Sequence, residues 1–411
     1  MKIFCIVGTR PEFIKMFPVY KVLQEKLKTN ADLTIKWINS SQHKDLLKDL
    51  EEFFGITSDY NFPLSKAVES KNRLANLHSE ILKQATKLFE QEKPDLVFIQ
   101  GDTITAQACG LAAFYQKIKI AHIEAGLRTW NINNPFPEEL SRRILSQISD
   151  LNFAPELKAK KNLDIEKQIF KKKSFNFYTG NTVIDALSYS MNKILADDFN
   201  WQNSNYLEHP FDNKKLDLSE YLKNLKAKKY ILFTSHRREN YLNNNGLNNI
   251  QNLINAIKRL ANNRFTQKYE FVVMVHKNPD VKKIFKNFYN DCKKNNLKQI
   301  KFIDSVSYPA FLKLMANSHF IVTDSGGIQE EAPYLKKPVL VFRESTERIA
   351  GLELGLAKLI GTQESIVHGA ILDLLTNEKS YNSMIEIGLQ PYGDGLAAQR
   401  IVDASLLFLK K

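Results

Sequence analysis

Three acidic side chains in the first half of the chain have the type and placement for proton transfer. Asp102 follows the apolar run Leu96–Ile99. Glu124 follows the run Ile118–Ile123, and Glu138 opens a later helical pattern. Carboxylates that meet at one edge of a sheet shift one another's pKa values apart, so that one acts as a base and another as an acid. The structural alternatives are that Asp102 only caps its helix and that Glu138 or Glu139 only complements a helix dipole.

The segment after the first apolar run suits an anionic group. After Ile3–Val7, Gly8 allows a tight turn and Pro11 suits the first position of a helix. Arg10 stands beside the N–H groups that such a helix start presents, and Lys15 adds a positive charge one turn later. The pattern predicts either a phosphate cradle or a plain helix start with an arginine in solvent, and it favours neither.

The most specific pattern lies in the second half, after the apolar run Phe320–Thr323. Ser325, Gly326 and Gly327 lead from this run into a helix, and Glu331 follows one turn inside it. Backbone N–H groups without bulky side chains can approach a pyrophosphate, and an acidic residue can accept hydrogen bonds from ribose hydroxyls. The pattern is neither a Walker motif nor Gly-x-Gly-x-x-Gly. It favours a nucleotide diphosphate site over a turn that only packs closely.

Two histidines follow apolar runs in the same way. His236 comes after Tyr230–Thr234 and precedes two arginines, which favour anionic ligands. His276 takes the same place one predicted strand later. The histidines have no metal-ligand spacing to Asp, Glu or Cys, so we expect no metal site.

The elements that must position these groups are short apolar runs separated by amphipathic stretches. We expect strands at 3–7, 33–38, 96–99, 118–123, 151–153, 175–178, 230–234, 271–275, 300–303, 320–323, 339–342 and 359–360. Helical patterns lie between them, for example at 77–89 and 105–115. This alternation predicts parallel sheets covered on both faces, which bind ligands beyond the carboxyl ends of their strands.

The regular pattern lapses over 196–228, which indicates a crossing between domains. We therefore predict an α/β protein with two Rossmann-like, doubly wound domains that face each other across a cleft. The first would span 1–185 and the second, which would bind the nucleotide, 186–392. We expect the helical tail at 393–411 to complete the first domain.

Composition is that of a globular protein. The chain has 411 residues, 43% of them hydrophobic, and 58 Lys and Arg against 45 Asp and Glu. We attribute most of the net charge of +13 to solvated surface, because nucleic-acid binding would need a basic stripe with interleaved aromatic residues. No apolar run approaches the roughly 18 residues of a membrane-spanning helix, so we expect no membrane insertion and a cytoplasmic protein. Cys5, Cys109 and Cys292 are expected to be buried, reduced thiols.

Together these segments resemble the non-hydrolysing UDP-N-acetylglucosamine 2-epimerases. The resemblance rests on motifs that occur in the family's order and span nearly the whole chain. They are Gly8–Glu12, Gly101–Thr103, His122–Thr129, Pro137–Glu139, Gly180–Asp185, His236–Glu239, Asp324–Pro333, Lys337–Val341 and Pro391–Gly395.

The resemblance implies a GT-B-like fold, usually a homodimer, that acts on a UDP-sugar without a cofactor. The implied catalytic residues are Asp102, Glu124, Glu138 and His236. The implied contacts to substrate or UDP are Arg10, Lys15, Arg142, Phe311, Ser325, Gly326, Gly327, Glu331 and Arg348, with His236 also close to UDP. In the implied reaction C2 loses its proton while UDP leaves C1, and UDP then adds back to 2-acetamidoglucal after C2 is protonated on the opposite face. The product would supply ManNAc-type sugars for a surface polysaccharide.

The chain departs from the family pattern in two places. Ile349–Gly351 replaces the usual Pro-Glu-Ala after Arg348. Gln42, His43 and His276 are read as remnants of the second, activating substrate site of some bacterial members, but Glu80 stands where an arginine is expected, so the sequence does not predict allosteric activation.

Three alternatives to this reaction stay open. The first two are epimerisation of another UDP-HexNAc and a hydrolysing variant that releases ManNAc and UDP. The third is a GT-B glycosyltransferase, because a shared fold does not determine the reaction.

Overall fold

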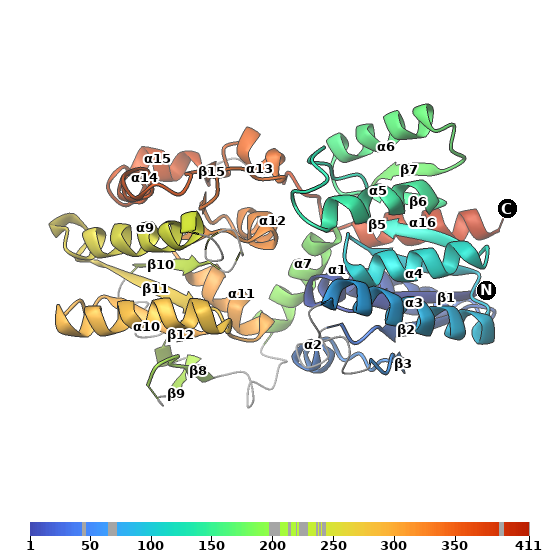
Figure 1. Cartoon of the computed structure of the whole chain (residues 1–411), viewed down its shortest axis with the longest axis horizontal. Helices are drawn as coiled ribbons and strands as arrows, with labels where there is room; N and C mark the ends of the chain where they lie inside the picture. Colours follow the sequence, from blue (N-terminus) through green and yellow to red (C-terminus); the bar gives the residue numbers. More distant parts are fainter. Residues whose placement is uncertain are drawn as a thin grey trace. The chain divides into compact units, whose positions relative to one another are not determined.

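The structure is a computed structural model of the chain. It describes residues 1–42, 47–64, 72–196, 206–212, 215–218, 220–221, 229–235, 237, 240, 244–385 and 390–410. The chain forms two compact units, one of Met1–Tyr189 with Tyr392–Lys411 and the other of Ser190–Pro391 (Figure 1). Within the described residues no helix is both long and apolar enough to cross a membrane.

The first unit is built on a sheet of seven parallel strands in the order β3-β2-β1-β4-β5-β6-β7. The strands are β1 (Lys2–Val7), β2 (Thr34–Asn39), β3 (Tyr60–Asn61), β4 (Leu96–Gln100), β5 (Lys119–Ile123), β6 (Leu151–Ala154) and β7 (Phe175–Tyr178). The order reverses between β1 and β4, which is the place where ligands bind in open α/β sheets. The groups that follow these two strands are therefore the first to consider for a site.

Helices cover both faces of this sheet. They are α1 (Arg10–Leu27), α2 (Lys48–Phe54), α3 (Arg73–Glu92), α4 (Ile104–Tyr115), α5 (Glu138–Ile148), α6 (Leu157–Ile169), α7 (Thr182–Leu195) and α16 (Ala397–Leu409). Neighbouring residues of β2 show the two faces, because successive side chains of a strand point to opposite sides. Trp37 packs edge-on against Phe13 of α1, whereas Ile38 joins the core under α3 and α4.

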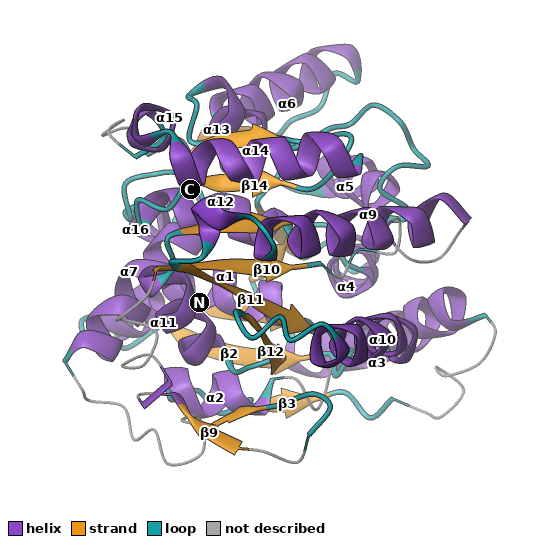
Figure 2. Ribbon diagram, turned by 90° about the vertical axis from the view of Figure 1, so that its left-hand side faces the viewer, coloured by secondary structure: helices purple, strands orange, loops and turns teal. Residues whose placement is uncertain are grey.

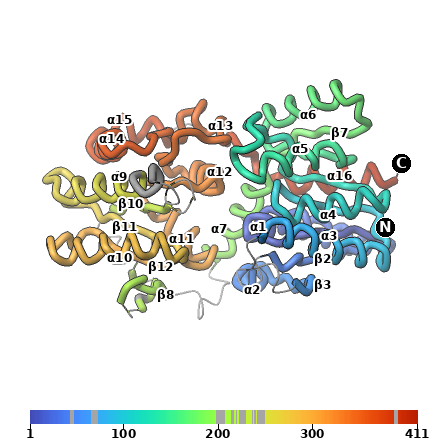
Figure 3. Tube along the Cα trace, viewed as in Figure 1, coloured from blue at the N-terminus to red at the C-terminus, as the bar shows by residue number. Residues whose placement is uncertain are grey.

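The C-terminal helix α16 returns to the first unit. It packs against α1, so the red end of the chain lies beside the blue beginning in Figure 3. Its first turn is held by α7, where Asp185 Oδ1 accepts a hydrogen bond from the Ala398 N–H over 2.9 Å. Gly180 and Gly393 pack so closely that a Cβ on Gly180 would lie 3.2 Å from the Gly393 Cα.

The second unit repeats the same architecture. Its six parallel strands follow the order β12-β11-β10-β13-β14-β15, and helices surround them in Figure 2. The strands are β10 (Lys229–Thr234), β11 (Tyr269–Val275), β12 (Ile300–Asp304), β13 (Phe320–Thr323), β14 (Val339–Val341) and β15 (Ala357–Leu359). The helices are α9 (Asn244–Ala261), α10 (Pro279–Lys294), α11 (Tyr308–Asn317), α12 (Gly326–Tyr334), α13 (Ile349–Glu353), α14 (Glu364–Thr376) and α15 (Glu378–Ser383), with a short 3-10 turn at Arg264–Thr266.

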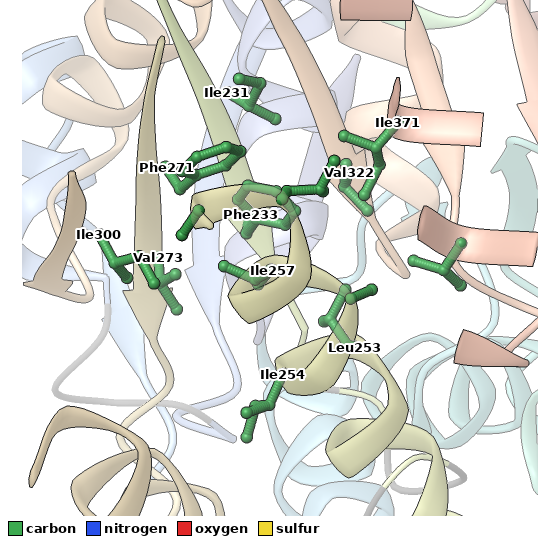
Figure 4. Packing of buried hydrophobic residues seen from close by; sticks show 14 of the residues in the cluster. Ile231, Phe233, Leu253, Ile254, Ile257, Phe271, Val273, Ile300, Val322 and Ile371 are labelled. Carbon is green, nitrogen blue, oxygen red and sulfur yellow. The ribbon is translucent and has the colours of Figure 1, made fainter. Parts of the chain in front are cut away.

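The core of the second unit lies between its central strands and α9. Figure 4 shows Phe233 of β10 beside Phe271 of β11, with Leu253 and Ile257 of α9 against them. All four side chains are buried. Strand β10 also pairs with β13, and the candidate nucleotide loop follows β13.

The predicted alternation of strands and helices, in two doubly wound parallel sheets, is confirmed. Three short strands were not predicted: β3, and the hairpin of β8 (Tyr206–Glu208) and β9 (Lys215–Asp217). They are two or three residues long and have no apolar run, so they exist only because a partner strand supplies hydrogen bonds. The last strand, predicted at 359–360, begins two residues earlier and ends one residue earlier, at Ala357–Leu359.

Candidate functional site

The turn after β1 is closed by a buried carboxylate. Thr9 caps α1, and Glu12 Oε2 accepts hydrogen bonds from the backbone N–H groups of Gly8 and Thr9 over 3.1 and 2.8 Å. Glu12 Oε1 accepts from the Thr103 hydroxyl over 2.5 Å. Burial raises the pKa of Glu12 to about 7, although these hydrogen bonds oppose the rise. We predicted Pro11 as the first helical residue, but α1 begins at Arg10, so Pro11 is the second residue of its first turn.

The same turn has no room for a side chain at Gly8. A Cβ there would lie 2.1 Å from Ser40 Oγ and 2.2 Å from Thr105 Oγ1. These two hydroxyls are themselves 2.7 Å apart, and Gln42 Oε1 accepts from the Thr105 hydroxyl over 2.8 Å. The ends of β1 and β2 and the start of α4 therefore form one buried polar cluster.

Asp102 follows β4 and does not cap the next helix. The cap of α4 is Thr103, whose side chain accepts from the Ala106 N–H. Asp102 Oδ2 instead accepts a hydrogen bond from Arg142 Nε over 2.6 Å in an ion pair. The capping alternative for Asp102 is therefore wrong, and its carboxylate points toward α5.

A buried histidine supports the turn that carries Asp102. His122 Nε2 lies 2.7 Å from the carbonyl oxygen of Gly101, which has a φ of 70°. A carbonyl only accepts, so Nε2 carries the proton. Burial lowers the pKa of His122 to about 4, so the ring is neutral near pH 7.

Glu124 follows β5 in a left-handed conformation, with a φ of 62°. Its Oε2 accepts hydrogen bonds from Lys15 Nζ over 2.5 Å and from Gln100 Nε2 over 2.7 Å. The side chains of Lys15 and Glu124 are both only 8% exposed. The sequence suggested Lys15 as a contact to the diphosphate, and the structure places its ammonium group against Glu124.

Glu138 is the first residue of α5, one turn before Arg142. The neighbouring Glu139 is fully buried and accepts hydrogen bonds from the backbone N–H groups of Thr129 and Trp130 over 3.0 and 3.1 Å. Burial opposes its charge, but these bonds and Arg143 outweigh that effect and lower the pKa of Glu139. Glu139 therefore anchors the loop after β5.

These contacts bring Asp102 and Glu124 to one edge of the first sheet. Gln100 of β4 pairs with Ile123 of β5, so Asp102 and Glu124 lie just beyond paired strand ends. Arg142 ties the first turn of α5, which begins at Glu138, to Asp102. Such a group can take a proton from a carbon acid and return it from another direction.

The loop of the second unit is fixed by Asp324, which directly follows β13 and is fully buried. Its Oδ2 accepts three hydrogen bonds: from Ser235 Oγ over 2.9 Å, from the Arg237 N–H over 3.0 Å and from Asn240 Nδ2 over 2.9 Å. Asp324 thus ties the ends of β10 and β13 together, at the strand-order reversal of the second sheet.

Ser325 is the cap residue of α12, and its side chain makes no capping hydrogen bond. A Cβ on Gly326 would lie 3.6 Å from Arg237 Nη2 and from Arg348 Cζ, so two guanidinium groups lie at this helix start. A Cβ on Gly327 would meet nothing within 4 Å. Open backbone and two arginines at a helix N-terminus fit a diphosphate.

Two further predicted contacts lie close by in the same unit. Glu331, one turn into α12, is buried and accepts a hydrogen bond from the Tyr308 hydroxyl over 2.7 Å. Phe311 is half-buried on α11, one turn after Tyr308.

Arg348, a third predicted contact, donates hydrogen bonds to Glu330 and Glu347 over 2.8 and 3.0 Å. Residues Ile349–Gly351, where the sequence departs from the family pattern, form the start of helix α13 (Ile349–Glu353). Arg348 is the N-cap residue of this helix.

The remaining predicted residues are more dispersed. His236 and His43 lie outside the described residues. Arg10, at the start of α1, lies 3.5 Å from Asp49 in an ion pair that is about one-third exposed on both sides. His276 is exposed and its Nδ1 accepts from the Asn278 N–H. Among the described residues, no cluster of His, Cys, Asp and Glu could hold a metal ion.

Several residues of the site were not predicted. Glu12 could have been found, because Thr-x-x-Glu before an apolar stretch is the pattern of a capping box. Asp324 directly follows a predicted strand, which is a weaker signal. Gln100 has no local signal, because its partner Glu124 is set by the fold, whereas Glu139 and Glu347 also contact arginines within four residues of themselves.

Nearly the whole chain matches one protein family. Residues 25–406 match the family model described as UDP-N-acetylglucosamine 2-epimerase. The chain belongs to this family. A UDP-N-acetylglucosamine 2-epimerase of Campylobacter jejuni is 39% identical over 404 residues, which are 98% of this chain and 96% of that protein. One of Bacillus subtilis is 38% identical over 408 residues, which are 99% of this chain and 95% of that protein.

Solved structures of the UDP-N-acetylglucosamine 2-epimerase family have the same fold. The crystal structure from Neisseria meningitidis, bound to UDP-GlcNAc, matches with a TM-score of 0.83 at 36% identity and covers 99% of this chain and 100% of that one. The crystal structure of the enzyme from Methanocaldococcus jannaschii, in complex with UDP-GlcNAc and UDP, matches with a TM-score of 0.77 at 30% identity. The match covers 99% of this chain and 100% of that one. The predicted family, fold class and enzyme class, a nucleotide-sugar epimerase, are confirmed.

Proposed function

We propose that this protein interconverts UDP-N-acetylglucosamine and UDP-N-acetylmannosamine by eliminating UDP and adding it back. The observation that carries the proposal is the placement of Asp102 and Glu124 just beyond paired strand ends, each held by a cation. Support comes from relatives of nearly equal length that carry the name of this enzyme.

The first unit would perform the proton transfers. One carboxylate takes the proton from C2, the C–H electrons form the C1–C2 double bond, and the C1–O bond breaks with its electron pair leaving on UDP. Another group then protonates C2 from the opposite face, and a diphosphate oxygen adds to C1. The scheme is redox-neutral. We assign these transfers to the set Asp102, Glu124 and Glu138, with His236 as a further candidate from the second unit.

Lys15 and Arg142 would act through the carboxylates that they contact. A base that removes a proton from carbon must be well placed and shielded from water. Lys15 orients Glu124 and Arg142 orients Asp102, each through a bond of 2.5 to 2.6 Å from a nearly buried cation. Both cations also add positive charge where the anionic substrate would bind.

The second unit would hold UDP. The backbone of Ser325, Gly326 and Gly327, together with Arg348, supplies donors for the diphosphate oxygens as charge develops on the leaving group. Glu331, oriented by Tyr308, would accept hydrogen bonds from the ribose. Phe311, Arg10 and His236 stay proposed contacts to UDP.

The test is incubation of the purified chain with UDP-GlcNAc in D₂O, followed by proton and phosphorus NMR. Epimerisation by elimination predicts UDP-ManNAc at a constant ratio to UDP-GlcNAc, with deuterium at C2 of both. Accumulation of free ManNAc and UDP would show a hydrolysing enzyme instead. Turnover that requires an added sugar acceptor would show a glycosyltransferase, and turnover only of another UDP-HexNAc would change the substrate.

We also propose a cytoplasmic homodimer. The three cysteines of the chain are free and buried, as expected for a protein that folds under reducing conditions. Light scattering on the purified protein should give twice the 47.3 kDa mass of one chain. A mass of one chain at micromolar concentration would overturn the dimer.

A further inference from the structure

Glu347 lies at the centre of an arginine cluster beside the start of α12. Its Oε1 is 3.0 Å from Arg348 Nη1 and 3.5 Å from Arg237 Nη2. Its Oε2 accepts a hydrogen bond from Arg343 Nη1 over 3.1 Å. The Glu347 side chain is only 7% exposed. One carboxylate therefore bridges three guanidinium groups with both of its oxygens.

Two of these guanidinium groups are the ones that lie against Gly326. Arg237 and Arg348 share the same Glu347 oxygen, and both lie 3.6 Å from the place of a Cβ on Gly326. Burial opposes the charge of Glu347, but Arg348, Arg237 and Arg343 hold its pKa far below the usual range. Glu347 is thus a permanent anion next to the proposed diphosphate site.

The local charge balance shows what this anion does. Arg237, Arg343 and Arg348 carry three positive charges, and Glu347 with Glu330, which binds Arg348 Nε over 2.8 Å, carries two negative ones. Without Glu347 these three guanidinium groups would lose one negative charge that contacts all of them. A bound diphosphate would then gain more electrostatic attraction, because charges interact strongly where water is scarce.

We propose that Glu347 is an internal anion that competes with the substrate's diphosphate for Arg237 and Arg348, and so limits the affinity for UDP. The proposal rests on the proposed UDP site, and in it Glu347 acts through Arg237 and Arg348 without touching the substrate. UDP leaves C1 and returns in each catalytic cycle, and the product must also dissociate. A diphosphate site without this anion would hold UDP longer than turnover requires.

The test compares Glu347→Gln with the wild type by titration calorimetry. We expect the variant to bind UDP about tenfold tighter, which corresponds to about 1.4 kcal/mol, and to bind uridine unchanged. In steady-state kinetics both KM and kcat for UDP-GlcNAc should fall, because release becomes slower. Glu347→Asp, which keeps the charge, should restore most of the wild-type affinity.

Glu344→Gln is the matched control. Glu344 lies three residues earlier, is exposed, and accepts a hydrogen bond from the Thr362 hydroxyl over 2.5 Å. The control removes the same charge from the same segment but should leave UDP affinity within twofold of the wild type. Equal tightening in both variants would show an effect of overall charge and overturn the proposal.

A purely structural role for Glu347 predicts the opposite sign. Loss of the bridge would then loosen the arginines, so UDP would bind more weakly, and this result would overturn the proposal. If Glu347→Gln does not fold, Glu330→Gln tests the same idea on Arg348 alone, with a smaller tightening expected. Failure of the proposed UDP site would be visible separately, because the wild type itself would not bind UDP.

Discussion

The hydroxyl of Thr103 donates a hydrogen bond to Glu12 Oε1 over 2.5 Å and so joins the turns after β1 and β4. Thr103 is the neighbour of Asp102, and Glu12 holds the backbone from which Arg10 projects. The two turns flank the strand-order reversal of the first sheet. The buried Glu12 carboxylate therefore fixes the positions of these two turns relative to each other.

Replacing Glu12 with Gln should weaken this link. One acceptor oxygen becomes an amide that faces backbone N–H or hydroxyl donors, which leaves a buried polar group unsatisfied and costs about 1 to 3 kcal/mol. We expect kcat to fall by about tenfold as Asp102 loses its support. Urea unfolding and steady-state kinetics measure the two effects. Thr103→Ser, which keeps the hydroxyl, is the control and should remain close to the wild type.

Glu12 should also leave a signature in the pH dependence of stability. Its pKa is about 7 in the folded chain, against 4.5 for the ordinary group. The folded state binds this proton more tightly, so the contribution of Glu12 to stability is complete below pH 4.5 and is lost as the pH rises to 7. The free energy of unfolding should fall by up to about 3 kcal/mol over this pH range. Urea unfolding between pH 4.5 and 7.5 should show this component in the wild type and not in Glu12→Gln.

His122 should produce the opposite slope. Its pKa is about 4 when folded, against 6.5 ordinarily, because of burial. Its contribution is therefore present above pH 6.5 and is lost as the pH falls toward 4, by up to about 3 kcal/mol. His122→Gln cannot titrate and can keep a donor for the Gly101 carbonyl, so it should resist acid better than the wild type. If His122→Gln lost stability between pH 6.5 and 4 as steeply as the wild type, His122 would not be the group that titrates there.

Asp102→Asn should remove epimerisation while leaving UDP binding intact. The amide cannot accept a proton at neutral pH, so we expect at least about a hundredfold loss of kcat. Asp102 lies in the first unit, whereas the proposed UDP contacts of the glycine loop lie in the second. NMR of the reaction and calorimetry with UDP provide the two measurements. A variant that turns over at the wild-type rate would show that Asp102 has no role in proton transfer.

Gly8→Ala should destabilise the chain by several kcal/mol. Its Cβ would be placed 2.1 Å from Ser40 Oγ and 2.2 Å from Thr105 Oγ1, and buried hydroxyls packed on several sides cannot move without breaking their bonds. Gly369→Ala is the control, because an exposed Cβ in the interior of α14 meets nothing within 4 Å. It should increase stability by about 0.5 to 1 kcal/mol. Thermal or urea unfolding of both variants provides the comparison.

Local patterns alone determined most of the framework. Apolar runs predicted twelve strands, and the helical tail predicted within 393–411 contains α16, which spans Ala397–Leu409. A helix start at Pro11 was also predicted, one residue from the observed start of α1 at Arg10. These features depend on neighbours within a few residues, so the sequence contains them directly.

The pairing of polar side chains at the site depends on the tertiary structure. Lys15 and Glu124 are 109 residues apart, and Glu12 and Thr103 are 91 apart, yet each pair is joined by a short hydrogen bond. Both pairs exist because β1 and β4 are neighbours at the strand-order reversal and β5 lies next to β4. The sequence identified Glu124 as a candidate and missed Glu12. Sheet order and burial determine which partner orients each carboxylate, because such pairing depends on distances in space.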